Sequence, residues 1–184
     1  MENVIQGRLI TKETRHEMFG QVDGGANSMT PEKYQRATIV DLTGIPCPKN
    51  NMRINLRTNE MKEVAFPNLN PDGFDYSENF DGSQIVNGNT IYVNLKCVVG
   101  SGGSQTRSLR EVYWFIKGQL NVLKNTSDKL YFANVLDGDE AHSVMDKYQH
   151  LLSNPEYDNV KSHVYVGDLR DYLLWVNKLR DETQ

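Results

Sequence analysis

The sequence predicts an α/β fold in which a mixed central sheet is flanked by helices. From residue 80 onward, short runs with alternating apolar residues are interleaved with segments that have the 3.6-residue period of a helix. Strands that alternate with helices of this length imply some parallel pairing. An Asn-Gly pair between the first two runs adds an antiparallel hairpin to that sheet.

The composition is that of a globular domain. The chain has 184 residues, 38% hydrophobic and 24% charged, which suffices for a packed core. A net charge of -4 argues against strong nucleic-acid binding by the whole surface, although a local basic patch remains compatible with it. Cys47 and Cys97 lie far apart and indicate neither a zinc site nor a disulfide framework.

The sequence also bears on location. No apolar run approaches the roughly 18 residues that a membrane helix needs. The first residues lack the basic and apolar stretches of a signal peptide. We therefore expect a single cytoplasmic domain that makes no membrane contact.

Residues 1–45 are expected to form a helical N-terminal segment ahead of a core at 46–184. A first helix is predicted at 4–19, followed by a glycine-rich break. The second helix has a clear start, because Thr30 can cap it and Pro31 suits its first position, and Gly44 ends it.

The core begins with a stretch that is hard to assign. Residues 52–64 alternate like a strand only at their start, and 66–82 are rich in Asn, Asp, Gly and Pro, which predicts a loop. The remaining elements are clearer. They are strands at 80–86 and 90–99, a helix at 104–123, a strand at 129–136, a helix at 139–152, a strand at 162–168 and a helix at 169–179.

The second strand of the hairpin carries the candidate chemistry. Side chains alternate along a strand, so Asn94 and Lys96 share a face, and the hairpin brings Asp81 beside them. Carboxylates hold Mg²⁺ through oxygen ligands, and the metal activates a water for attack on a phosphodiester. A lysine nearby orients that water or stabilises the developing charge.

The motif "FDG…TIYVNLK…GG" resembles that of the PD-(D/E)XK nucleases, and most closely the FokI-type cleavage domain. The order of the following strands and helices is also similar, so that the resemblance covers about residues 70–178. It implies a restriction-endonuclease-like core and Mg²⁺-dependent cleavage of double-stranded DNA. Asp81 and Lys96 stand at the family's acid and lysine positions.

One position departs from the family pattern, because Asn94 stands where an Asp or Glu is expected. The acid can have migrated to Glu111 on the following helix, Asn94 can be a substitution made to trap uncleaved DNA, or the chain can be a nuclease fold that only binds. The resemblance thus implies Asp81, Asn94 and Glu111 as metal ligands and adds Lys96 as a catalytic residue. A second Asp-Gly, at Asp72, lies further from the lysine in a predicted loop.

The segment after the lysine-bearing strand is the predicted DNA contact. Glycines ahead of a helix let backbone N–H groups approach a phosphate, and Arg107 and Arg110 can contact the DNA backbone, with Gln105 beside them.

The resemblance also bears on partners, because the segment before the core is too short for a separate recognition domain. The chain is expected to be the small cleavage subunit of a heterodimeric type IIS enzyme, with a larger DNA-recognition subunit, or to pair with a second copy of itself. The acidic net charge favours the first arrangement. A catalytically inactive DNA-binding or assembly module is the alternative.

Overall fold

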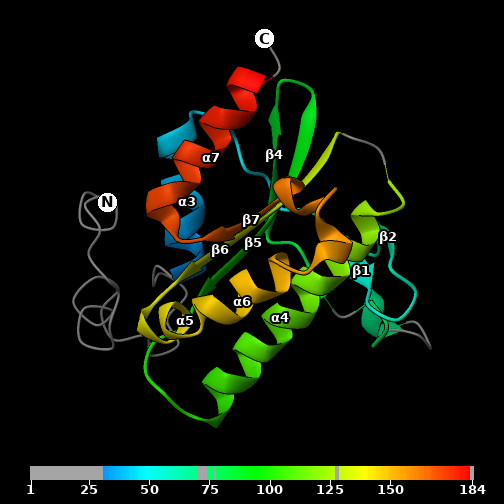
Figure 1. Ribbon diagram of the computed structural model, residues 1–184, viewed down its shortest axis with the longest axis vertical. Coiled ribbons are helices and arrows are strands. Elements are labelled where there is room, and N and C mark those ends of the chain that lie inside the picture. Colours follow the sequence, from blue (N-terminus) through cyan, green and yellow to red (C-terminus); the bar gives the residue numbers. More distant parts are fainter. Residues whose placement is uncertain (1–30, 70–73, 77, 127–128, 183–184) are drawn as a thin grey trace.

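The computed structural model describes residues 31–69, 74–76, 78–126 and 129–182 (Figure 1). The helix predicted at 4–19, the cap at Thr30 and the second Asp-Gly at Asp72 lie outside the described residues.

The central sheet is mixed, as predicted. It contains β4 (Gly82–Val86), β5 (Asn89–Cys97), β6 (Leu130–Asp137) and β7 (Val164–Gly167), side by side in that order. Strands β4 and β5 are antiparallel, whereas β5, β6 and β7 run parallel to one another. The carboxyl ends of the three parallel strands therefore meet at one edge of the sheet.

The hairpin between β4 and β5 is confirmed. Its turn is the pair Asn87-Gly88, and both residues have positive φ, 50° and 80°. That combination is a type I′ turn, whose twist matches the twist of the strands. The turn fixes the register, in which Val86 faces Asn89 and Gly82 faces Val93.

Helices cover both faces of this sheet (Figure 1). On one face lie α3 (Pro31–Thr43) and α7 (Leu169–Glu182). On the other lie α4 (Gly103–Leu123) and α6 (Met145–Leu152), with the short α5 (Asp139–Ser143) before α6. Among the described residues no helix is long and apolar enough to cross a bilayer.

Helix α3 belongs to the packed core rather than to a separate segment. Its Ile39 is fully buried and shares a cluster with Val93 of β5 and Val176 of α7. The predicted stop at Gly44 is confirmed, since this residue has φ +69° and its N–H donates to the carbonyl of Val40 at 2.8 Å.

One predicted helix is divided in two. The sequence predicts a continuous helix at 139–152, but Val144 has φ -111° and ψ 8° and separates α5 from α6. The side chain of Val144 packs against the hydrophobic core. The chain therefore changes direction here to bury this valine.

A second, smaller sheet forms within residues 52–79. Its strands are β1 (Met52–Asn55), β2 (Glu60–Glu63) and β3 (Glu78–Asn79), and all pairs are antiparallel with β1 in the middle. The predicted loop at 66–82 thus contributes β3 and a 3-10 turn at Pro67–Leu69. Strand β1 packs on α4 through the buried Ile54.

Candidate functional site

Asp81 is anchored to β5 at the point where β4 begins. Its N–H donates to the carbonyl of Val93 at 2.8 Å, and its carboxylate Oδ2 accepts from the N–H of Leu95 at 2.7 Å. Strand β5 continues past the start of β4, so this carboxylate takes the place of a missing backbone partner. The carboxylate of Asp81 is therefore bound to the residue that directly precedes Lys96 in β5.

The charges of Asp81 and Lys96 act on each other. Burial raises the pKa of Asp81, whereas the Leu95 N–H and the positive charge of Lys96 lower it. The ion pairs within 4 Å that join described residues do not include these two side chains. The lysine thus lies within electrostatic reach of the carboxylate without forming a direct ion pair.

Asp81 lines a charged cleft of about 480 Å³, here called the α3 cleft. Its walls come from the first turns of α3, from the segment before β1 and from the segment that leads into β4. The lining residues are Glu32, Lys33, Arg36, Lys49, Asn50, Asn79, Phe80 and Asp81. A carboxyl group with a raised pKa in a charged cleft is a common feature of functional sites.

Two charged residues of α3 act on Asp81 directly. The negative charge of Glu32 raises its pKa and the positive charge of Arg36 lowers it. The two are four residues apart, so they lie on one face of the helix. This role cannot be predicted from the sequence, because helical spacing does not tell which distant strand a helix face meets.

Asn94 is part of a buried amide network. It is 2% exposed, and its Nδ2 donates to Oδ1 of Asn134 at 3.0 Å. Gln119 donates to the same oxygen at 3.0 Å, and Asn134 Nδ2 donates back to Gln119 at 2.7 Å. A carboxylate at position 94 has no proton to donate to Asn134. The network gives a physical reason for an amide at this position.

Glu111 is exposed on α4. None of the interactions recorded among the described residues joins it to Asp81, whose charged neighbours are Lys96, Glu32 and Arg36. Within the described ranges no three His, Cys, Asp or Glu side chains are close enough to hold a metal together. The set of three metal ligands, Asp81, Asn94 and Glu111, stays a prediction.

The predicted DNA contacts lie in the first turns of α4. Arg107 and Arg110 are exposed, and Gln105 is half-buried with its Oε1 accepting from the hydroxyl of Ser104 at 2.7 Å. Gln105 and Ser104 border a second cleft of about 410 Å³ beside the glycine-rich segment. The arginines are accessible to a ligand, and their role also stays a prediction.

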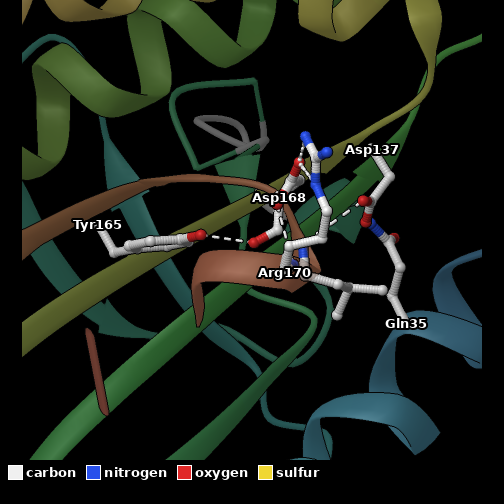
Figure 2. A network of polar contacts seen from close by, with 6 residues as sticks. Gln35, Asp137, Tyr165, Asp168 and Arg170 are labelled. Atoms are coloured by element: carbon white, nitrogen blue, oxygen red, sulfur yellow. Dashed lines mark hydrogen bonds and ion pairs between the residues drawn. The ribbon is translucent and has the colours of Figure 1, made fainter. Parts of the chain in front are cut away.

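A buried carboxyl group lies at the end of the neighbouring strand, and the sequence reasoning missed it. Asp137 ends β6, is 6% exposed, and accepts from Nε2 of Gln35 at 2.6 Å (Figure 2). The same Nε2 donates to the carbonyls of Lys96 at 3.0 Å and Val135 at 3.2 Å. One amide group of α3 thus holds the ends of β5 and β6 together.

Burial raises the pKa of Asp137 to about 6. The bond from Gln35 lowers it, and the negative charge of Asp168 raises it further. Asp168 is paired with Arg170, whose Nε donates to Oδ2 at 2.6 Å (Figure 2). Acidic and basic side chains therefore gather at the carboxyl ends of the parallel strands, the edge at which α/β sheets bind ligands.

Comparisons of this chain with protein-family models, with curated proteins and with solved structures found no match. Its function is therefore inferred from its own residues, their geometry and the resemblance of its motif.

Proposed function

We propose that this chain is a Mg²⁺-dependent, restriction-type DNA endonuclease that hydrolyses phosphodiester bonds. It acts as a cleavage subunit, together with a larger recognition subunit or with a second copy of itself. One observation carries the proposal. Asp81, directly before β4, and Lys96 of the antiparallel strand β5 are electrostatic neighbours, and Asp81 lines a charged cleft, in the order of elements that the family resemblance implies.

The donor set of the α3 cleft fits a hard divalent cation. Asp81 and Glu32 both line it, and the negative charge of Glu32 raises the pKa of Asp81. Asp81 and Glu32 would hold such a cation, which would offset their mutual repulsion and would supply an activated water for attack on phosphorus. Glu32 is thus the second carboxylate that we assign to the site, and Glu111 is the acid to compare with it.

Lys96 supplies positive charge where the reaction develops negative charge. Its backbone is fixed by β6 on one side and by Gln35 through its carbonyl oxygen. A lysine anchored in this way can stabilise the charge that builds up on the phosphate. Removal of one such group from an active site costs about 100- to 1000-fold in rate.

Cleavage of supercoiled plasmid DNA tests the proposal. The protein is incubated with Mg²⁺, alone and with the protein encoded beside it, and compared with Lys96→Ala, Asp81→Asn, Glu32→Gln and Glu111→Gln. We expect the first three variants to lose about 100-fold or more in rate and Glu111→Gln to cut like the unmodified chain. The matched control is Lys129→Ala, at the amino end of β6.

Two results refute the endonuclease. One is the absence of cleavage under every condition, with and without the neighbouring protein. The other is unchanged cleavage by Lys96→Ala, since this identifies a contaminating nuclease. Loss of activity in Glu111→Gln but not in Glu32→Gln moves the second carboxylate to α4.

A non-cleaving DNA-binding or assembly module is the second candidate. It is favoured by the engagement of Asn94 in the amide network, since among the residues that the structure describes no group of acids surrounds it. The Asn94→Asp variant separates the two candidates, provided that it folds. Cleavage gained only in this variant indicates a nuclease site that lacks one acid, whereas DNA binding without cleavage by any form indicates the module.

A further inference from the structure

We propose that the α3 cleft holds the DNA backbone and that Lys33, Arg36 and Lys49 are its phosphate-binding side chains. The identity of the ligand rests on the proposed function, but the binding surface can be tested without cleavage. This surface lies beside α3 and the start of β4, whereas the sequence predicts DNA contacts at the first turns of α4.

The volume and the net positive charge of the cleft suit the binding of a phosphodiester group. Its volume of about 480 Å³ lies within the range of about 300–1,000 Å³ typical of ligand pockets. Three cations and two carboxylates line it, which gives a net formal charge of +1. Lys33 and Lys49 are exposed and Arg36 is half-buried, so the two lysines can follow a flexible backbone while the arginine stays closer to Asp81.

The segment that carries Lys49 is fixed relative to Asp81. The N–H of Ser83 donates to the carbonyl of Pro48 at 3.1 Å, which ties this segment to β4. A Cβ on Gly82 would lie 2.6 Å from Sγ of Cys47 and 3.1 Å from both Pro48 O and Arg36 Nη1. Only a glycine after Asp81 lets the segment approach this closely. The Asp-Gly pair thus lets the segment that carries Lys49 line the same cleft as Asp81.

The same charges make binding conditional on a divalent ion. Without one, the carboxylates of Asp81 and Glu32 oppose a phosphate that the three cations attract. One divalent ion held by these acids raises the formal charge of the cleft from +1 to +3. Attraction at the exposed Arg107 and Arg110 of α4 does not depend on the charge of Asp81, which allows the two surfaces to be told apart.

Fluorescence anisotropy of a labelled 20-base-pair duplex, at a length of about two helical turns, measures this directly. Binding is recorded in EDTA and in Ca²⁺, which occupies an oxygen site without supporting turnover, over about 50 to 200 mM salt. The test variant is Lys33→Ala with Lys49→Ala. The matched control is Lys129→Ala with Lys178→Ala, which removes the same charge from the amino end of β6 and from α7.

We expect the test variant to lower the slope of log K against log salt by about 1.8, or about 0.9 for each lost phosphate contact. The control pair leaves the slope unchanged. Asp81→Asn is expected to bind more tightly than the unmodified chain in EDTA and to lose most of the gain that Ca²⁺ produces. Thermal unfolding confirms that each variant is folded.

An unchanged slope in the Lys33/Lys49 variant overturns the inference, as does a lack of duplex binding in both EDTA and Ca²⁺. A slope that falls only in Arg107→Ala with Arg110→Ala assigns the DNA to α4 instead. Binding through the cleft without plasmid cleavage leaves the inference standing and refutes the endonuclease. Plasmid cleavage that is unchanged in the Lys33/Lys49 variant supports the endonuclease and overturns the inference about the α3 cleft.

Discussion

Replacement of Asp137 by Asn is expected to stabilise the fold at neutral and alkaline pH. Burial raises the pKa of this carboxyl from its ordinary 3.8 to about 6. A difference of one pKa unit between the folded and the unfolded chain corresponds to about 1.4 kcal/mol. The ionised carboxylate therefore destabilises the fold by about 3 kcal/mol. An asparagine still accepts from Gln35 and loses only the long 3.4 Å bond from the Leu169 N–H, about 1 kcal/mol. The net gain is about 2 kcal/mol.

The pH dependence has a definite sign. The folded chain binds the Asp137 proton more tightly than the unfolded chain does, so this group contributes most to stability below pH 3.8. That contribution falls as the pH rises and is lost above about pH 6. The difference in unfolding free energy between the variant and the unmodified chain should therefore grow across this window and level off above it.

Urea unfolding over a pH series, followed by far-UV circular dichroism, gives these free energies. Asp171→Asn is the matched control, since Asp171 is exposed on α7. Destabilisation by Asp137→Asn at about pH 8, with an unchanged pH slope, would show that the ionised group is a favourable partner in the core. The reasoning from desolvation would then be refuted.

Three further substitutions probe the packing around the site, each read out by urea unfolding. Asn94→Asp is expected to destabilise the fold by about 1–3 kcal/mol at neutral pH, because a carboxylate cannot donate to Asn134; equal stability would mean that the network rearranges. Gly82→Ala should cost about 1–3 kcal/mol by crowding Cys47, and a neutral effect would mean that the 47–49 segment shifts freely. Gln35→Met removes the amide that donates to Asp137 and to the carbonyls of Lys96 and Val135, and should cost about 2–4 kcal/mol. A loss below about 1 kcal/mol would mean that water replaces the amide.

The elements that sequence reasoning predicted well are those determined by local signals. The Asn87-Gly88 turn requires positive φ at two successive residues, which few other pairs adopt. The helical period over 104–123 recurs in the buried face of α4, and Gly44 ends α3 as expected. These features depend on residues that are near one another in the chain.

The features that it missed depend on contacts across the fold. The break at Val144 follows from burial against the core, and β1 to β3 are too short for a clear alternating pattern. Gln35 lies 102 positions before Asp137, and nothing in its helical spacing indicates that its amide meets the ends of two strands. The same is true of Glu32, which reaches Asp81 only after the helix docks on the sheet.

Strand β5 has a hydrogen-bonded strand on each side and helices over both faces. Backbone in that position opens only with global unfolding, so its central amides are expected to exchange with solvent more slowly than those of α3. Lys96 lies beyond the start of β4, near the end of β5, where β6 and the Gln35 amide hold its backbone. The cations of the α3 cleft belong to a helix start and a connecting segment, where substitution disturbs little packing. Substitutions in the α3 cleft can therefore change which ligand it prefers, while the backbone of Lys96 keeps its position in the sheet.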